Sequence, residues 1–463
     1  MKFNAEEFVK ATGAKILREK SGECCGIEND TRRLQGGELY FAITGPHFDG
    51  HTFCADAVKK GAWGLVVEKE VPIAEDSPPI ALFQVPDTVK AMGDIAAWWR
   101  RQFAIPVVAI TGSNGKTTTK EMIAAILSEK WNLLKTPGNF NNLIGLPLTL
   151  NHLTKNHQAV VLEMGMNAFG EIKRLTEIAA PTVGIITNVT ACHLEQLQTI
   201  DAVAAAKGEL FAAMGKSGIA IVNGDDPQIQ KQTKKFFGRR LTFGMSPECD
   251  VHFEHMEMRG WESMDLVFSV KGKQLKAHVQ AVGIHNVMNA LGACAVALSL
   301  GCSNDQMAAG LEKFSPLKMR LEQVQLANGV RLVNDAYNAN PLSMEAAFRT
   351  VSSAKRKGRF LAVLGDMKEL GKEASLLHQQ VGKAAAKNGV GRLFLTGEFA
   401  DKIAEGAITG GLVKNKITIS QELDELISVI VDEVKAGDVI LVKASRAMRL
   451  ERIVDELKER FGI

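Results

Sequence analysis

The sequence has 463 residues, which is enough for roughly three domains of ordinary size, each with its own core. Hydrophobic residues make up 46%, charged residues 23%, and the formal net charge is +3, so composition gives no electrostatic case for nucleic acid or an anionic membrane as a partner. With no secretory signal, no apolar run of about 18 residues, and seven scattered cysteines in neither disulfide nor zinc spacing, we expect a cytoplasmic protein with reduced thiols.

Short apolar runs separated by turn residues fill the first hundred positions. The runs are GELYFAI, GAWGLVVE and IALFQV, and the polar stretch PIAEDSPP at residues 72–79 predicts a surface loop. Near Ile105 the pattern changes to a continuous apolar strand followed by an apolar stripe at helix spacing. We therefore predict a small α/β domain over residues 1–104.

Buried-strand runs alternate with helical segments through the rest of the chain. In residues 105–315 the runs are QAVVLEMG, TVGIITNV and GIAIVNGDD, and the alternation is typical of a doubly wound, mostly parallel sheet. The apolar stretch from Val287 predicts a buried helix that is too short to span a bilayer. From about Pro316 the pattern restarts with VRLVNDAYN, RFLAVLGDM, RLFLTG and DVILVKASR, which predicts a third, Rossmann-like α/β domain over residues 316–463.

A glycine-rich turn in AITGSNGKTTTKEM, residues 109–122, lies between a predicted strand and a predicted helix. Glycine backbones let phosphates approach, and the helix N-terminus offers oriented N–H groups. Lys116 would neutralise the β and γ phosphates, the Thr117 hydroxyl would reach Mg²⁺, and Ile110 replaces the first glycine of the standard P-loop. The loop alone does not separate ATP from GTP. The residues predicted to hold the nucleotide here are Gly112, Ser113, Asn114, Gly115, Lys116, Thr117 and Thr118.

Three further side chains could serve chemistry, and each also has a structural interpretation. Glu163 ends a predicted strand beside the P-loop, where it could bind Mg²⁺ or simply be solvated. Lys207 falls on the apolar face of a predicted helix, and it could reach the surface along its methylenes or, with a lowered pKa, react with CO₂ to form a carbamate. His193 follows another strand and could be structural or a ligand.

The shortened loop T-G-S-N-G-K-T-T, with motifs further along the chain, resembles the Mur ligase family of ATP-dependent amide-bond synthetases of peptidoglycan precursors. The resemblance implies ATP and Mg²⁺ as cofactors. It implies metal binding by Thr117, Glu163, His193 and a carbamylated Lys207. It also implies that Lys116, Lys207 and His193 take part in catalysis together with an arginine at the next domain junction.

That arginine is Arg320 in KMRLE, where the family places a contact to the γ-phosphate, although it could also be an ordinary surface residue. The segment GIHNVMNALGA is similar to the family element H-N-x-x-N-x-x-A, which implies that Asn289 lies by the adenine. The segment NDAYNANPLSM supplies Asp335 for the ribose hydroxyls and Asn338 near the nucleotide by the same resemblance. These residues favour ATP.

Three asparagines lie in TPGNFNNLIGLP, which begins at Thr136. Asn139, Asn141 and Asn142 could be turn formers or could hydrogen-bond a polar substrate, and the match to the family's substrate loop favours the second role.

Two more segments imply substrate contacts. The stretch NDTRRLQGGELYFAITGPHFDGHTF resembles a uridine diphosphate-binding domain of the family, which implies that Thr31 and Arg32 contact a nucleotide sugar. The family's K-G-S-R element appears here with Ala444 in place of glycine, which leaves open how Ser445 and Arg446 would meet an incoming dipeptide.

The form D-A-Y-N-A-N-P is typical of the branch of the family that adds D-alanyl-D-alanine, and no D-N-P-R follows residue 316. The resemblance therefore implies a monomeric enzyme of cell-wall synthesis that uses UDP-N-acetylmuramoyl-tripeptide and D-alanyl-D-alanine, proceeds through an acyl phosphate, and forms ADP and phosphate. The alternatives are a ligase for another acceptor, such as a diamino-acid adding enzyme or a folylpolyglutamate synthetase, and a P-loop regulatory ATPase without ligase activity.

Overall fold

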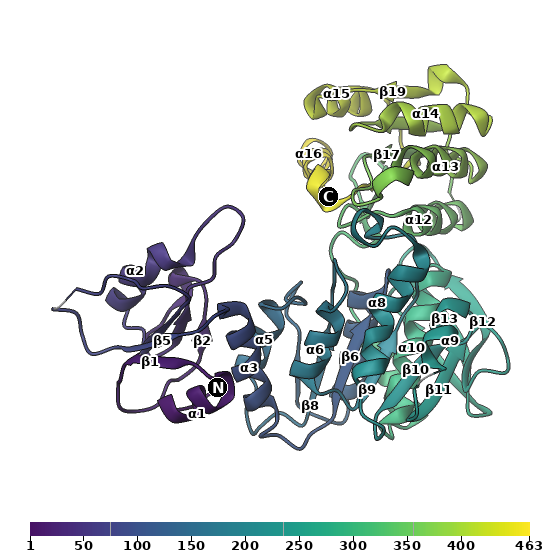
Figure 1. Ribbon diagram of the computed structural model, residues 1–463. Coiled ribbons are helices and arrows are strands. Elements are labelled where there is room, and N and C mark those ends of the chain that lie inside the picture. The colour runs from purple at the N-terminus through teal and green to yellow at the C-terminus, as the bar shows by residue number, and fades with distance from the viewer. Residues whose placement is uncertain (75, 235, 355) are drawn as a thin grey trace.

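The computed structural model describes residues 1–74, 76–234, 236–354 and 356–463. Within these ranges the chain forms three sheets, of five, nine and six strands. Figure 1 shows the three parts as separate lobes, with the purple first domain at one end and the green-to-yellow third domain above the central one. The α/β fold class is confirmed. The divisions predicted at residues 104/105 and 315/316 fall between sheets.

The first sheet runs in the order β1-β5-β4-β3-β2, with β1 antiparallel to β5 and the other pairs parallel. The runs GELYFAI, GAWGLVVE and IALFQV contain β3, β4 and β5, as predicted. The described part of residues 72–79 is loop, and residue 75 lies outside the described residues. The elements of this domain are β1 (Lys15–Arg18), β2 (Ile27–Glu28), β3 (Leu39–Phe41), β4 (Gly64–Val67), β5 (Ala81–Gln84), α1 (Ala5–Thr12), α2 (Cys54–Lys59), η1 (Thr31–Arg33) and η2 (Gly50–Phe53).

Helix α3 (Thr88–Arg100) ties the first domain to the central one (Figure 1). Asp87 caps its N-terminus by accepting a hydrogen bond from the Lys90 amide. Near its other end, the buried Arg100 donates from Nε to the carbonyl of Ala179 at 3.1 Å. Because such contacts join side chains of α3 to the central domain, the helix helps to fix the position of the first domain relative to the central one.

The central sheet runs in the order β14-β13-β12-β11-β10-β9-β6-β8-β7. Pairs from β7 to β12 are parallel, and the strands predicted in residues 105–223 are present as buried runs. The strands are β6 (Val107–Thr111), β7 (Leu133–Lys135), β8 (Ala159–Glu163), β9 (Val183–Ile186), β10 (Ile219–Asn223), β11 (Arg239–Gly244), β12 (Val251–Arg259), β13 (Ser263–Val270) and β14 (Lys273–Val279). The helices are α4 (Lys116–Ser128), α5 (Gly145–Asn151), α6 (Glu171–Ala179), α7 (Leu194–Leu197), α8 (Ile200–Ala213), α9 (Pro227–Thr233), α10 (Ile284–Ser299) and α11 (Asn304–Glu312).

The antiparallel meander β12–β14 extends this sheet and was not predicted. Its first strand, VHFEHMEMR, begins at the buried Val251 and is otherwise half-buried or exposed, because one face of an antiparallel sheet can stay in water. Helix α10 is the predicted buried helix, and its alanines and Cys294 lie in the core against β9 and β11.

The third sheet runs in the order β15-β16-β20-β17-β18-β19, parallel except for β15 with β16. The four strands predicted here are β16, β17, β18 and β20, and the edge strands β15 and β19 were not predicted. The elements are β15 (Glu322–Gln325), β16 (Arg331–Asn334), β17 (Phe360–Leu364), β18 (Arg392–Leu395), β19 (Ile417–Ile419), β20 (Val439–Lys443), α12 (Pro341–Ser353), α13 (Ala374–Lys387), α14 (Ala400–Thr409), α15 (Leu423–Glu433), α16 (Glu451–Phe461), η3 (Gly371–Glu373), η4 (Lys414–Lys416) and η5 (Arg446–Met448).

All seven cysteines belong to the described residues, and each is a free thiol, with only Cys25 exposed. No helix in the described part of the chain combines the length and the apolar character that crossing a membrane requires.

Candidate active site

A cavity of about 1040 Å³ opens between the central and third domains, at the carboxyl ends of the parallel central strands. Ligands of open α/β sheets bind at this edge. Among the predicted site residues, Gly112, Lys207, Thr31 and Arg32 do not line the cavity. Those that line it are Ser113, Asn114, Gly115, Lys116, Thr117, Thr118, Asn139, Asn141, Asn142, Glu163, His193, Asn289, Arg320, Asp335, Asn338, Ser445 and Arg446.

The P-loop joins β6 to α4, and two of its glycines are required by space. A Cβ on Gly112 would lie 1.9 Å from the hydroxyl of Thr187, and one on Gly115 would lie 2.2 Å from Oδ1 of Asn289. Gly115 also has φ +77, a left-handed conformation that side chains rarely adopt. The glycines therefore let the loop pack tightly against α10 and the residue after β9, and the amides of Ser113 and Asn114 donate to the carbonyl and the side chain of Asn188 at 2.9 Å.

Lys116 is folded back onto its own loop. Its ammonium donates to the carbonyl of Gly112 at 2.7 Å and contacts that of Ser113 at 3.4 Å. Burial lowers the pKa of Lys116. A phosphate bound in this loop would replace the two carbonyls as the partner of the Lys116 ammonium.

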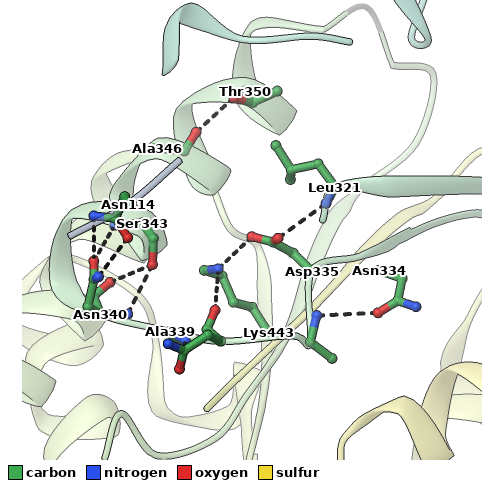
Figure 2. A network of polar contacts seen from close by, with 12 residues as sticks. Asn114, Leu321, Asn334, Asp335, Ala339, Asn340, Ser343, Ala346, Thr350 and Lys443 are labelled. Atoms are coloured by element: carbon green, nitrogen blue, oxygen red, sulfur yellow. Dashed lines mark hydrogen bonds and ion pairs between the residues drawn. The ribbon is translucent and has the colours of Figure 1, made fainter. Parts of the chain in front are cut away.

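The third domain contacts the P-loop through two side chains. The guanidinium of Arg320 donates to the Thr117 hydroxyl at 3.0 Å and stacks 4.2 Å from the ring centroid of Tyr337. Asn340, which caps α12, exchanges amide hydrogen bonds with Asn114 at 2.7 and 3.2 Å (Figure 2). Sequence reasoning missed the Asn114–Asn340 pair, since its members are 226 positions apart.

Asp335 lies at the end of β16 and is held from two sides. Its carboxylate accepts from Lys443 at 2.5 Å and from the Leu321 amide at 3.1 Å (Figure 2). Lys443 also donates to the carbonyl of Asn338 at 2.9 Å. Lys443 is almost fully buried, so this ion pair is shielded from solvent. The pair fixes Asp335 and Asn338 at the cavity wall.

The buried Asn289 lies at the start of α10 and faces the P-loop. Its Oδ1 accepts from the Thr119 hydroxyl at 3.2 Å, and its Nδ2 donates to Asn286 at 3.0 Å. His285 lies beside them, and burial lowers its pKa to about 4, so its imidazole is neutral near pH 7. These side chains do not cap the helix, whose N-cap is Gly283.

Glu163 and the asparagine loop, residues 136–142, form one hydrogen-bonded unit. Oε1 of Glu163 accepts from Asn141 at 2.8 Å, and the Glu163 amide donates to the Thr136 hydroxyl at 3.0 Å. Oε2 of Glu163 is buried without a hydrogen-bond partner and lies 4.0 Å from Nζ of Lys120. Lys120, which sequence reasoning missed, is 1% exposed and donates to the carbonyl of Thr136 at 2.9 Å.

The other two asparagines of this loop also shape its backbone. Oδ1 of Asn142 accepts from the Gly145 amide at 2.8 Å and from the Ile144 amide at 3.2 Å, which is a turn-forming role. The carbonyl of Asn139 accepts from the Asn141 amide at 2.7 Å. Both residues nevertheless line the cavity, so turn formation and substrate contact are compatible.

Lys207 is buried on α8, with 1% of its surface exposed, so it does not reach the surface along its methylenes. Among the described residues none gives its ammonium a hydrogen bond or an ion pair. The pKa of Lys207 is lowered to about 7, mainly by burial, with a smaller contribution from the charge of Lys116. The neutral amine of Lys207 is therefore accessible near pH 7.

His193 lies just before α7 and faces the third domain. Its Nδ1 is 2.6 Å from Oε2 of Glu369, and this contact lowers the pKa of Glu369. Sequence reasoning did not single out Glu369, although it lies in GDMKELG, residues 365–371, directly after β17. The two ring nitrogens of His193 are thus not equivalent, because only Nδ1 contacts the carboxylate.

The oxygen and nitrogen atoms that line the cavity suit Mg²⁺ better than they suit a metal ion whose ligands all come from the protein. The described residues contain no group of three His, Cys, Asp or Glu side chains that could hold an ion. Mg²⁺, however, keeps several waters and takes phosphate oxygens, so it needs few protein ligands. The unpartnered buried Oε2 of Glu163 is one such oxygen beside the P-loop.

Of the remaining predicted residues, two belong to the cavity lining and two to the first domain. Ser445 is buried and its hydroxyl accepts from the Lys368 amide at 2.9 Å, whereas Arg446 is exposed and pairs with Glu451 at 2.9 Å. In the first domain Thr31 is buried. Arg32 is exposed and pairs with Asp30 at 2.7 Å, so the structure does not bring it to the cavity.

Fold and cavity together define a three-domain α/β protein with a P-loop nucleotide site that the third domain covers. Residues 110–297 match the Mur ligase middle domain, and residues 319–446 match the Mur ligase glutamate ligase domain. The chain belongs to the Mur ligase family.

Individual relatives match over nearly the whole chain. The UDP-N-acetylmuramoyl-tripeptide–D-alanyl-D-alanine ligase of Bacillus subtilis is 35% identical over 98% of both chains. A crystal structure of MurF from Acinetobacter baumannii superposes with a TM-score of 0.91 at 31% identity over 99% of both chains. MurF of Thermotoga maritima in complex with ADP has a TM-score of 0.83 at 28% identity, covering 94% of this chain and 98% of that one.

Proposed function

We propose that the protein is an ATP-dependent ligase that joins D-alanyl-D-alanine to UDP-N-acetylmuramoyl-tripeptide and forms ADP and phosphate. The proposal is carried by one observation: the P-loop, Arg320 and the asparagine loop share a single cavity. The names of the full-length relatives support the choice of substrates. Ligases for other acceptors superpose at 18% identity or less, which supports only a common fold.

The reaction needs two displacement steps, because an amine does not displace oxide from a free carboxylate. In the first, a carboxylate oxygen of the tripeptide attacks the γ-phosphorus of ATP and ADP leaves, which forms an acyl phosphate. In the second, the amine of D-alanyl-D-alanine attacks the acyl carbon, phosphate leaves, and the nitrogen loses a proton. Lys116 and Arg320 offset the charge on the phosphoryl oxygens, and the remaining residues position the reactants.

The nucleotide would be held at the junction of the two domains. The P-loop residues 112–118 would bind the phosphates, Asn289 would lie by the adenine, and Asp335 and Asn338 would meet the ribose side. Arg320 would contact the γ-phosphate only when the third domain is docked.

Mg²⁺ would be held by Thr117, Glu163, His193 and a carbamylated Lys207, and it would neutralise charge on the phosphates when bound. The neutral amine of Lys207 can attack CO₂, which forms an N–C bond and releases a proton to give the carbamate. The burial of Lys207 and its missing partners support this modification, because the amine form is available near pH 7.

The substrates would approach from the other two domains. Asn139, Asn141 and Asn142 would hydrogen-bond the muramoyl tripeptide, and Thr31 and Arg32 of the first domain would contact its nucleotide sugar. The dipeptide would meet the third domain near Ser445 and Arg446. These roles follow the divisions 1–104, 105–315 and 316–463.

We place the reaction in the cytoplasm, where ATP and nucleotide-linked sugars are available. One chain supplies every side chain assigned above, so we propose that it acts as a monomer. Its product would feed peptidoglycan synthesis and thereby cell growth, shape and division.

The test is phosphate release measured with ATP and UDP-N-acetylmuramoyl-tripeptide. Release should require D-alanyl-D-alanine and should not respond to lysine, diaminopimelate or glutamate. Dependence on one of those amino acids instead would reject the proposed acceptor, and slow release without any acceptor would indicate a regulatory ATPase.

A further inference from the structure

Two residues with unusual backbones face each other across the junction of the central and third domains. His193 has φ +53 and Glu369 has φ +65, and both are non-glycine residues in the left-handed region. Such conformations are uncommon and persist where the surrounding structure imposes them. Here the two strained positions are the two ends of one contact, with His193 Nδ1 2.6 Å from Glu369 Oε2.

The backbones around this contact are packed closely enough to hold it in place. The Glu195 amide donates to the carbonyl of Glu369 at 3.2 Å. A Cβ on Gly371 would lie 3.2 Å from both the carbonyl oxygen of Leu194 and Cα of Glu195. The segment 369–371 therefore sits directly on the start of α7, and the position of Glu369 depends on the third domain being docked.

We infer that Glu369 is a positioning residue that orients the imidazole of His193 for the metal only when the third domain is docked. A carboxylate on one ring nitrogen fixes the tautomer and the ring plane, and it leaves the other nitrogen for a ligand. Nδ1 is the nitrogen in contact with Glu369, which leaves Nε2 outside this contact, and His193 is a residue of the cavity lining. The inference rests on the role of His193 in the proposed function.

This arrangement links domain closure to the metal. The central domain alone supplies Glu163, Thr117 and His193, but the group that orients the histidine comes from the other side of the cavity. Metal affinity should therefore be highest in the docked arrangement, in which Arg320 also reaches the P-loop.

The experiment measures Mn²⁺ binding to the full-length enzyme in the presence of a non-hydrolysable ATP analogue, from the electron paramagnetic resonance signal of free Mn²⁺. Glu369→Gln should weaken Mn²⁺ binding about tenfold, the lower end of the range for groups behind a metal ligand. Glu373→Gln is the matched control, since it makes the same chemical change on an exposed residue at the end of η3, four positions further along the chain, and should stay within twofold of wild type.

A double-mutant cycle with His193→Ala separates positioning from a general effect. In the His193→Ala background, Glu369→Gln should change Mn²⁺ affinity less than twofold, because the group on which Glu369 acts is gone. Equal weakening in both backgrounds, or no weakening in the wild-type background, would overturn the inference.

A second variant guards against loss of folding. Glu369→Asp retains the charge and tolerates the left-handed backbone, but its shorter side chain withdraws the carboxylate from His193. It should weaken Mn²⁺ binding like Glu369→Gln while the melting temperature stays near that of wild type, and wild-type affinity in this variant would contradict the inference. Because Mn²⁺ binding needs no acceptor, these outcomes are independent of whether D-alanyl-D-alanine is the substrate.

Discussion

At the scale of single residues, Lys207 is a cationic side chain whose buried surroundings disfavour its charge. Its position on an apolar helical face was readable from the sequence, because Val203, Leu210 and Phe211 share that face and all are buried. The sequence did not predict whether the Lys207 ammonium reaches solvent. The answer depends on what covers α8 in three dimensions, and the structure leaves Lys207 only 1% exposed.

Stability should report this burial. Below pH 7 Lys207 is protonated in both states, and burying the cation costs the folded state on the order of 5 kcal/mol, from a pKa lowered from 10.5 to about 7. Between about pH 7 and 10.5 the unfolded chain binds the extra proton, so this cost falls as pH rises. In CO₂-free buffer, Lys207→Met should therefore unfold at higher urea than wild type at pH 7, and the gap should shrink toward pH 10.

The control for that titration is Lys173→Met, which removes an exposed lysine and should leave the pH dependence of the urea midpoint unchanged. A gap between Lys207→Met and wild type that stays constant from pH 7 to pH 10 would show that Lys207 keeps its ordinary pKa in the folded protein.

Activity should report the carbamate. We expect Lys207→Ala to lose at least about 100-fold in kcat, because the ligand for the metal is missing. A short carboxylic acid, which can occupy the vacated space and supply an oxygen, should restore part of the activity in a phosphate-release assay. Full activity of the variant without any addition would refute the modification.

At the scale of elements, the buried parallel strands were predictable and the partly solvated ones were not. RFLAVLGDM and DVILVKASR are continuous apolar runs because helices cover both faces of their sheet, and they form β17 and β20. The meander β12–β14 mixes His, Glu and Lys with apolar residues, so its pattern is weaker. The contact of Asn340 with Asn114 has no local signal at all, since it depends on how two domains meet.

Asn340 has two separable roles at the start of α12. Its Oδ1 accepts from the Ser343 amide as the cap, and its Nδ2 donates to Asn114 at 2.7 Å. Asn340→Asp keeps the cap but loses the donor, so we expect the KM for ATP to rise about threefold to tenfold with little change in Tm. Asn340→Ala loses both and should also lower the free energy of unfolding by about 1–2 kcal/mol.

Steady-state kinetics and thermal unfolding of the two variants distinguish these roles. If Asn340→Asp leaves the KM for ATP at the wild-type value, the pair with Asn114 makes no contribution to nucleotide binding.

At the scale of the whole molecule, side-chain contacts within the described residues join the third domain to the cavity side of the central domain: Arg320 to Thr117, Asn340 to Asn114, and Glu369 to His193. Each pairs a residue of the central domain at the cavity with one from a segment after residue 316. A sequence can place these residues in their motifs, but it does not state that they meet.

Arg320 should therefore affect the chemical step more than binding. We expect Arg320→Ala to lower kcat about 100-fold, since one fixed donor to developing charge is removed. Arg320→Lys keeps the charge but loses the planar group that stacks on Tyr337, so it should recover only part of the rate. Single-turnover measurements of ADP formation would check both, with Arg452→Ala, a surface arginine of the same domain, as control.

Wild-type rates for Arg320→Lys would contradict a requirement for the guanidinium plane. An equal rise in KM with unchanged kcat for Arg320→Ala would show that the residue contributes to ground-state binding only.

The hydrogen bonds that Lys116 makes within the P-loop determine which ligands gain affinity by binding to this lysine. Its ammonium already has acceptors in the carbonyls of Gly112 and Ser113. A ligand that binds Lys116 therefore gains only the difference in free energy between its own hydrogen bonds to the ammonium and those of the two carbonyls. An anion offers a large difference, and a neutral group of the same shape offers almost none. Competitive inhibitors that have the shape of a triphosphate but not its charge would thus gain little affinity from the Lys116 ammonium.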